Sequence, residues 1–404
     1  MSFFSKNMDN KMAGYSGDAT NARLLYLALG GFILYNLQGV IYVSGSIISQ
    51  ACLLVCIVIG LYYWVRSLQY CLQSTLIFAI TCFLILNSVS YVFYTGMYSL
   101  LAFNHLKGIL SCFLPFFIGF QLTTKNKINP RVFEYLFYIL LVVNIFTFYR
   151  IQALLLASGS MTEDYLVNNI AYSFARLVPL MYFIRRNILV RVSLLLVVAY
   201  FILLGAKRGA IITGGFAIMI YLWYLINEVR KSAGTWTKMV TILSVVCFVV
   251  LVIRLVYADS FVVGRFEDGS SSGRDWIYSM IFNSWYSSND LSHLLFGYGF
   301  IASMNFTHEK LAHNDWLEIL SNFGIVGVVV YLGIYLSLVA VFLRSKFPAN
   351  SRYAFISILL MWGLTTLFST WYNSIDNFAL MLLLGHLVVF PFVEIEETET
   401  GDGE

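Results

Sequence analysis

Long apolar runs, separated by short polar stretches, follow one another along almost the whole chain. A helix of about 20 apolar residues crosses the roughly 30 Å hydrocarbon core of a bilayer, because each residue adds about 1.5 Å. Aromatic residues gather near many run ends, where amphipathic rings prefer the membrane interface. The pattern predicts about twelve transmembrane helices, at residues 23–43, 47–65, 74–92, 106–122, 132–149, 165–184, 189–205, 209–227, 239–257, 316–343, 353–372 and 377–393.

The composition agrees with a membrane environment. Hydrophobic residues make up 59% of the 404 residues and charged residues only 11%, which is too apolar for a soluble domain of this length. We therefore predict an all-α polytopic membrane protein. The net charge of +4 is small, and its lysines and arginines stand in short clusters between apolar runs. This placement indicates membrane topology rather than a nucleic-acid partner.

Basic residues fall in every second predicted loop when the N-terminus is placed in the cytoplasm. Cytoplasmic loops are enriched in lysine and arginine, so this alternation predicts a cytoplasmic N-terminus and, with an even number of spans, a cytoplasmic C-terminus. The basic loop residues are Arg66, then Lys125, Lys127 and Arg131, then Arg185, Arg186 and Arg191, then Arg230, Lys231 and Lys238, and finally Arg344, Lys346 and Arg352.

The same topology divides the chain into four parts. Residues 1–258 contain nine predicted spans, and we expect the first of them to act as the insertion signal in place of a cleavable signal peptide. Residues 259–315 form one large non-cytoplasmic loop, in which 276–286 have the spacing of a short amphipathic helix. Residues 316–393 contain three more spans, and 394–404 form an acidic cytoplasmic tail.

Several kinds of chemistry find no support in the sequence. The six cysteines all lie in or beside apolar runs and none lies in the large loop, so neither a disulfide framework nor a thiolate metal site is indicated. No Walker A sequence, dinucleotide glycine fingerprint or G-x-S-x-G elbow is present. We therefore expect any chemistry to take place at the non-cytoplasmic face.

Some cations break the alternation, and their cost in topology or solvation indicates a function. Arg176 is the most unusual, because it lies near the middle of a predicted span, where it is less able than Arg150 or Arg254 to reach the interface. The complete set is Lys107, Arg150, Arg176, Lys207, Arg208, Arg254, Arg265, Arg274 and Lys310.

A cationic pair stands at the predicted turn between the spans 189–205 and 209–227. Lys207 and Arg208 lie between glycine and alanine residues at the start of the second helix. Amide donors and a guanidinium converge at such a helix start, which is suited to holding a phosphate. The alternative is a turn whose cations touch anionic lipid headgroups.

The large loop carries two further arginines around a Gly-Ser run. Arg265 precedes this flexible segment, and Arg274 follows it at the start of the predicted amphipathic helix, which can wall a cavity. The alternative for Arg274 is a surface salt bridge with Asp275 or Glu267.

A polar cluster leads from the loop into the span 316–343. His313 and neighbouring carboxylates can supply a general acid or base, because imidazole titrates near neutral pH. Asn314 or Asp315 can instead cap the helix. A metal site at His308 and His313 is disfavoured, since residues five apart do not share one helical face.

These motifs, taken in order, resemble the O-antigen polymerase and O-antigen ligase superfamily. The resemblance covers about residues 165–345 and rests on order and spacing, because each motif alone is weak. The motifs are Arg208-Gly-Ala, Gly273-Arg274, Phe296-Gly-Tyr-Gly299, His313-Asn314-x-x-Leu317 and Gly324-x-x-Gly327.

The resemblance implies a fold related to the lipid-sugar-dependent glycosyltransferases of the GT-C type, in the bacterial inner membrane with a periplasmic active site. It implies glycosyl transfer from an undecaprenyl-diphosphate-linked oligosaccharide to an acceptor, without metal or nucleotide sugar. A protein that sets chain length is an expected partner of a polymerase. By the family pattern Arg208 and Arg274 hold the diphosphate, and His313 is the base. The other expected binding residues are Lys207, Arg176, Arg265, Asn314 and His308.

Three other functions are weighed against a polymerase. A ligase uses the same donor chemistry but transfers the glycan to lipid A-core, and no motif names the acceptor. A polysaccharide flippase or transporter would suit twelve spans with intramembrane arginine, although residues 1–200 and 201–393 show no persuasive internal repeat. A scaffold without chemistry leaves the outer-face cations unexplained. Family analogy and the moderate loop length favour the polymerase.

Overall fold

A computed structural model describes most of the chain, and the described residues fold into helices joined by turns and loops. The described ranges are residues 18–41, 45–125, 128–157, 167–232, 274–307 and 311–401. Arg265, His308 and the predicted span 239–257 lie outside the described residues.

Ten longer helices account for most of the described chain. They are α2 (Asp18–Asn36), α3 (Ile47–Ser67), α4 (Thr75–Val92), α5 (Ser99–Thr123), α6 (Arg131–Ala157), α9 (Ile188–Leu204), α10 (Arg208–Ser232), α16 (Asp315–Arg344), α17 (Ala349–Phe368) and α18 (Phe378–Gly401). Shorter helices connect them, namely η2 (Leu37–Gly39), η3 (Leu68–Tyr70), α7 (Ala171–Ala175), α8 (Val178–Met181), α13 (Arg274–Tyr286), α14 (Leu291–Phe296), α15 (Ser303–Phe306) and η5 (Ile375–Asn377).

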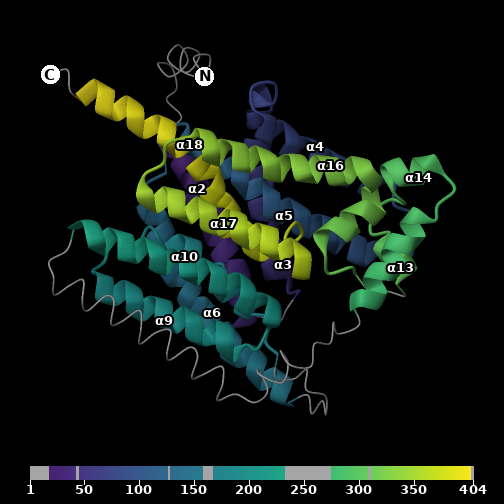
Figure 1. The fold of residues 1–404 in the computed structure, drawn as a ribbon, viewed down its shortest axis with the longest axis horizontal. Coiled ribbons are helices and arrows are strands. Elements are labelled where there is room, and N and C mark those ends of the chain that lie inside the picture. Colours follow the sequence, from purple (N-terminus) through teal and green to yellow (C-terminus); the bar gives the residue numbers. More distant parts are fainter. Residues whose placement is uncertain are drawn as a thin grey trace.

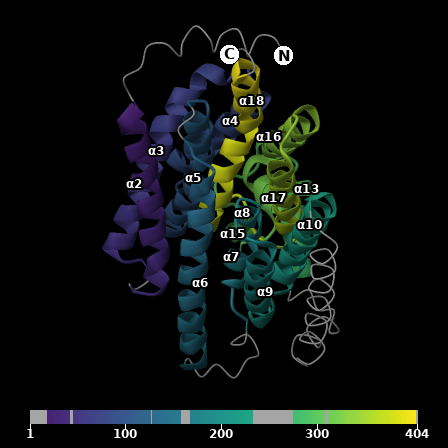
Figure 2. The same ribbon diagram turned by 90° about the vertical axis from the view of Figure 1, so that its left-hand side faces the viewer.

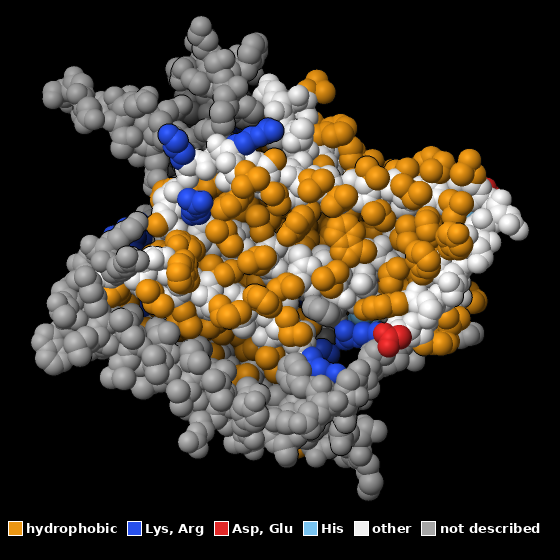
Figure 3. Space-filling view, in the orientation of Figure 1, with side chains coloured by type: hydrophobic (Ala, Val, Ile, Leu, Met, Phe, Trp, Pro, Cys, Tyr) orange, Lys and Arg blue, Asp and Glu red, His pale blue; other side chains and the backbone are white. Residues whose placement is uncertain are grey.

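Among the described residues, six helical segments are long and apolar enough to cross a membrane. They are Ile47–Tyr70, Thr75–Val92, Ser99–Thr123, Arg131–Ala157, Arg208–Val229 and Asp315–Arg344. Large hydrophobic side chains are exposed on these helices, and they cover much of the face over α16 and α17 (Figure 3). Such a surface suits lipid rather than water. The protein is therefore a polytopic membrane protein, and the count of twelve spans stays a prediction.

The predicted span 165–184 differs from the structure in form. Two helices of only five and four residues, α7 and α8, replace one continuous helix there. Pro179 at the start of α8 has no N–H to continue a hydrogen-bond ladder from α7. The broken segment leaves Arg176 at the end of α7 instead of within a long helix.

Helix α5 forms the centre of the fold. Almost every residue from Gly108 to Thr123 is buried, and α18 packs along it. Figure 2 shows α2 and α3 to one side and α10 and α13 to the other, with α5 and α18 between them. Some polar side chains inside this core are paired, as in the 2.8 Å contact between Thr123 Oγ1 and His386 Nδ1.

The two ends of the molecule carry different elements. Helices α13 and α14 lie at one end, near the starts of α10 and α16, whereas the C-terminal end of α18 lies at the opposite end (Figure 1). The starts of α10, α13 and α16 are therefore neighbours, although they are far apart in sequence. These three helix starts position the candidate site.

Candidate functional site

The turn between α9 and α10 presents the first pair of cations. The backbone N–H groups of Gly205 and Ala206 close the end of α9, and Ala206 has a φ of +48°, which an alanine adopts only at a steric cost. Lys207 follows at once, and Arg208 is the first residue of α10. The turn thus places both side chains, each partly exposed, at a helix N-terminus.

Short helix α7 packs directly against this turn. The Asn168 N–H donates to the Gly205 carbonyl at 2.9 Å, which joins the two segments. A Cβ on Gly209 would stand 2.0 Å from the Tyr172 hydroxyl oxygen, so only glycine leaves room for this ring. Tyr172 therefore lies beside the first turn of α10.

Helix α13 brings Arg274 to the same end of the molecule. Ile277 of α13 belongs to a small buried hydrophobic cluster with Ala312, the residue before His313. The Tyr278 hydroxyl donates to the His313 carbonyl at 3.5 Å, at the long limit for such a bond. Apolar packing thus fixes the helix that begins with Arg274 against the loop that carries the histidine.

His313 stands in this loop with an exposed side chain and a φ of +50°. Partial loss of water around the ring lowers the pKa of His313 from its usual 6.5, and the positive charges of Arg274 and Lys207 lower it further. The imidazole is therefore neutral at neutral pH and able to accept a proton. Backbone strain at a side chain that faces nearby cations is typical of a functional position.

Asn314 acts as the N-cap of α16. Its side-chain oxygen accepts from the Leu317 N–H at 3.1 Å, and its amide nitrogen donates to the Leu367 carbonyl at 3.3 Å. The capping alternative drawn from the sequence is therefore present, with Asn314 rather than Asp315 in the capping position. Both ends of this amide are engaged within the protein.

A break in α16 holds its first two turns in place. Gly324 has φ +60° and ψ −154°, so it interrupts the helix. The interruption frees the carbonyls of Ser321 and Asn322, which accept from the N–H groups of Tyr298 and Gly299 at 2.8 and 3.0 Å. The Gly-Tyr-Gly motif therefore completes the hydrogen bonding of the broken helix.

The close contact between the loop after α14 and the break in α16 requires glycine at positions 297 and 324. A Cβ on Gly324 would stand 2.5 Å from the carbonyl carbon of Leu295, and one on Gly297 would stand 2.4 Å from the backbone of Asn322. Both glycines also have positive φ angles. Side chains at either position would push the loop and α16 apart.

Two carboxylates at the start of α16 are buried and serve the fold. Asp315 accepts from the Tyr331 hydroxyl at 2.6 Å and from the Trp371 N–H at 3.0 Å. Glu318 accepts from the Ala312 N–H at 2.8 Å. Both side chains are fully buried, so they tie neighbouring loops to α16 and do not face the exposed imidazole of His313.

Arg176 is buried and paired. One guanidinium nitrogen lies 3.0 Å from a carboxylate oxygen of Asp376, and another donates to the Ser374 hydroxyl at 3.1 Å. The guanidinium also lies 5.9 Å from the centre of the Tyr172 ring. Arg176 thus joins α7 to η5. It also lies next to Tyr172, which borders the turn between α9 and α10.

Tyr172 is a candidate that sequence reasoning missed. Its side chain interacts with Ser369, Arg274 and Arg176. The available signal was its position four residues before Arg176, which is one helical turn. Tyr172 therefore connects the buried arginine with the exposed cations.

Four of the predicted site residues meet at one end of the molecule. Figure 3 shows Lys and Arg side chains gathered beside an acidic one, where α13 begins near the start of α10 and the end of α17. Lys207 and Arg274 both act on His313, and Arg208 adjoins Lys207. Such a group of cations and a neutral imidazole can hold a diphosphate and remove a proton from a hydroxyl.

Comparison with known proteins identifies a similar family for part of the chain. Residues 192–332 match the family model described as O-antigen ligase. The superfamily resemblance is thereby confirmed for this segment. It contains Arg208, Arg274 and His313, whereas Arg176 lies outside it. No curated protein matches the chain.

The family match supports a function of the O-antigen ligase or polymerase type in general. It implies a membrane enzyme of the glycosyltransferase kind that uses lipid-linked sugars, and it does not distinguish the two reactions.

Proposed function

We propose that the chain is a polymerase of O-antigen or a related surface polysaccharide in the bacterial inner membrane. In this reaction the growing glycan leaves undecaprenyl diphosphate and is joined to the non-reducing-end sugar of an incoming undecaprenyl-diphosphate-linked repeat unit. The site lies at the periplasmic face of a fold with about twelve spans, related to the lipid-sugar-dependent glycosyltransferases. Both chain termini lie in the cytoplasm, and a chain-length-determining co-polymerase is the expected partner.

One observation carries the proposal. The positive charges of Lys207, in the turn before α10, and Arg274, at the start of α13, both lower the pKa of His313, at the end of the molecule where α10 and α13 begin. The diphosphate of the donor needs positive charge to stabilise it as a leaving group. The acceptor hydroxyl needs a base that removes its proton. This arrangement supplies both.

The residues divide the reaction between them. Arg208 and Arg274 bind the diphosphate and stabilise the negative charge that grows as the bond from the anomeric carbon to the diphosphate oxygen breaks. The acceptor hydroxyl oxygen forms the new bond to that carbon and passes its proton to the imidazole of His313. The electron pair of the broken bond leaves with undecaprenyl diphosphate, so no metal or nucleotide cofactor is required by this scheme.

The helix starts support the assignment of the diphosphate pocket. The positive end of the α10 dipole favours an anion beside Arg208, as do the first amides of the helix, which cannot bond to carbonyls of the same helix. Arg274 occupies the same position in α13. Guanidinium groups bind phosphate oxygens in pairs, which suits the two phosphates of the carrier.

The remaining predicted residues take binding roles in the proposal. Arg176 supports the cationic lining through Tyr172, with which its guanidinium is in contact. Asn314, Lys207, Arg265 and His308 are assigned to substrate binding. Full polymerising activity of Arg176→Ala at normal protein level would remove that residue from the site.

The decisive experiment is deletion of the gene followed by glycan profiling. Lipopolysaccharide capped with a single repeat unit is the expected result for a polymerase. Core-only lipopolysaccharide with polymer accumulated on the lipid carrier would show a ligase instead. Normal glycan lengths would contradict both functions.

Ligation is retained as the second candidate because the matching family is described as O-antigen ligase. The donor chemistry at Arg208, Arg274 and His313 is common to both reactions, and only the acceptor differs. The moderate length of the large loop predicted at residues 259–315 and the divergent surrounding sequence favour polymerisation. Purified lipid A-core offered as acceptor tests the ligase directly.

A further inference from the structure

A hollow lies at the end of the molecule opposite the candidate site. It is a cavity of about 890 Å³ formed by the loop after α8, the start of α9, the end of α10 and the start of α17. Arg208 at the start of α10 and Glu228 near its end are twenty residues apart, which corresponds to about 30 Å along a helix. The cavity is therefore separate from the site at His313.

An ion pair with a buried arginine forms one wall of this cavity. Arg191 makes two hydrogen bonds to the carboxylate of Glu228, at 2.8 and 2.9 Å, and its side chain is only 9% exposed. The pair cancels most of the charge of both groups. The third guanidinium nitrogen of Arg191, Nε, is buried and has no hydrogen-bond partner among the described residues.

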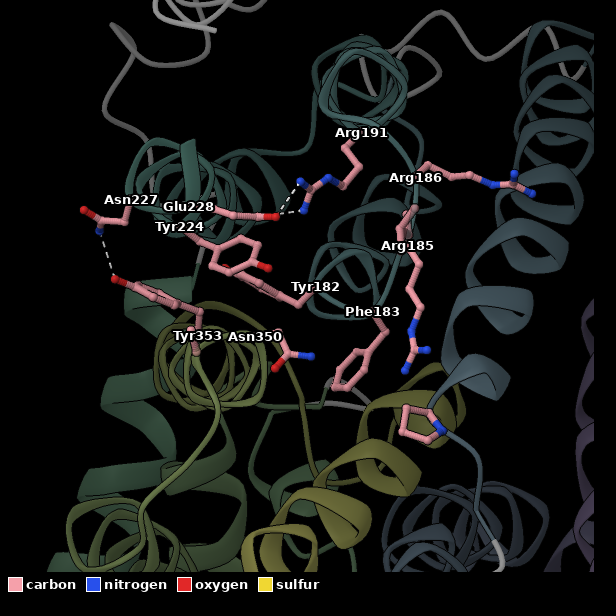
Figure 4. Close-up of a pocket in the computed structure, with 13 residues that line it drawn as sticks. Tyr182, Phe183, Arg185, Arg186, Arg191, Tyr224, Asn227, Glu228, Asn350 and Tyr353 are labelled. Carbon is pink, nitrogen blue, oxygen red and sulfur yellow. Dashed lines mark hydrogen bonds and ion pairs between the residues drawn. The ribbon is translucent and has the colours of Figure 1, made fainter. Parts of the chain in front are cut away.

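Arg185 supplies a positive charge for which the described residues offer no ion-pair partner. Its side chain is exposed and lines the cavity, and Figure 4 shows it running beside Phe183, away from the Arg191–Glu228 pair. Within the described parts of the chain, no carboxylate lies within ion-pair distance of it. Arg186, by contrast, extends toward α6, where Glu134 lies 3.9 Å from its Nε.

Neutral hydrogen-bonding groups and aromatic rings complete the lining. Tyr353 accepts from the Asn227 amide at 3.0 Å, and Asn350 and Tyr224 also face the cavity (Figure 4). These groups can hydrogen-bond hydroxyls next to an anion, while the rings contact carbon. The lining thus suits a phosphate group attached to a polyol rather than a bare inorganic ion.

We propose that this cavity binds the phosphate-bearing headgroup of an anionic membrane lipid, with Arg185 contacting the phosphate. The cavity is lined by Asn227 and Glu228, next to the end of the candidate membrane span Arg208–Val229, and lipid headgroups stand at the ends of such spans. Arg185 belongs to a predicted cytoplasmic loop, and the cytoplasmic leaflet carries anionic lipids. The proposal does not depend on the reaction assigned to the opposite end.

The test uses the full chain purified into phosphatidylcholine nanodiscs. Adding phosphatidylglycerol at increasing fractions should raise the unfolding temperature in a saturable way, whereas more phosphatidylcholine should not. Arg185→Gln should weaken the apparent affinity for phosphatidylglycerol about tenfold, since it removes charge-assisted hydrogen bonds to phosphate. Arg185→Lys, which keeps the charge, should recover part of the effect.

Arg344→Gln is the matched control, because Arg344 ends α16 and does not line the cavity. It should leave the phosphatidylglycerol effect unchanged. Equal loss in Arg185→Gln and Arg344→Gln would overturn the proposal by showing general surface attraction, as would equal stabilisation by both lipids. Glycerol phosphate added to the protein in detergent distinguishes a lipid headgroup from a soluble phosphate ester as the ligand. Stabilisation by glycerol phosphate without lipid would overturn the lipid proposal in favour of the soluble ester. Circular dichroism and gel filtration establish that each variant is folded.

Discussion

At the scale of single residues, His313 combines an exposed imidazole with two nearby cations, and this combination makes its titration a measurable signature. Only the neutral ring accepts a proton, and the pKa of His313 lies below its usual 6.5. We expect transferase activity to be retained from neutral pH down to below that value, and to be lost as the pH falls through the lowered pKa. The measurement is the initial rate of glycan transfer in proteoliposomes across pH.

Removing one of the cations should move this profile. Lys207→Gln eliminates a positive charge that acts on His313, so the pKa of His313 should rise and the loss of activity on acidification should begin at a higher pH. Lys346→Gln, a substitution in the loop after α16, should leave the profile in place. If the normalised pH dependence of activity is the same in Lys207→Gln as in the wild type, His313 is not the titrating base.

Arg208 offers a separate test of transition-state stabilisation. Arg208→Ala should lower turnover on the order of 10²–10³-fold, as loss of one electrostatic donor commonly does. The side chain is only partly buried, so the unfolding temperature should change little. Turnover of purified protein and a thermal unfolding curve are measured together, with Arg344→Ala as the control. A loss of activity that merely followed a loss of folded protein would contradict the assignment.

At the scale of elements, the break in α16 provides a matched pair of glycines in one helix. Gly324 has a positive φ and would place a Cβ 2.5 Å from the Leu295 carbonyl carbon, whereas Gly333 has open space around it. Gly324→Ala should cost about 1–3 kcal/mol of stability, as forced backbone strain typically does. Gly333→Ala should be neutral or slightly stabilising.

Thermal unfolding and glycan profiling of both variants make this comparison. Gly324→Ala should also shorten or abolish polymer, because the segment that leads from His313 into α16 loses its fixed position. Wild-type stability and polymer length in Gly324→Ala would show that α16 needs no break.

The sequence predicted some helices closely because their boundaries are local signals. The span 74–92 corresponds to α4, Thr75–Val92, which Ser74 caps by accepting from the Ile77 N–H. The predicted span 106–122 begins seven residues later than α5, since the polar Asn104 interrupts the apolar run before it. In the structure Lys107 donates to Gln50 at 2.9 Å and to Asn104 at 2.8 Å, so these polar residues fit within the helix. Such pairing across helices is invisible in a local pattern.

The site was predictable in part for the same reason. Lys207, Arg208 and Arg274 were predicted from the sequence because they break the alternation of basic loops and belong to an ordered set of motifs. The partner of Arg176, in contrast, is Asp376, which lies 200 residues further along the chain. The role of Asp315 as an anchor for Trp371 also depends on packing between distant helices. Neither contact has a signature in sequence spacing.

At the scale of the whole molecule, the topology is open to a direct experiment. The loop between α13 and α14 and the loop after α16 lie toward opposite ends of the molecule, and both contain exposed residues. In a variant with its native cysteines replaced, Ser287→Cys should react with a membrane-impermeant maleimide added to intact spheroplasts. Lys346→Cys should react only after the membrane is opened. The reverse labelling would invert the proposed orientation.

The break at Gly324 divides α16 into two segments that can change their relative angle when the thickness of the bilayer changes. Residues 315–323 are bonded through Ser321 and Asn322 to the loop at Tyr298 and Gly299, and they are not continuous with the rest of α16. We therefore expect tilting of residues 325–344 to be taken up at Gly324. In that case residues 315–323 stay bonded to the loop, and the position of His313 relative to the nearby cations is preserved.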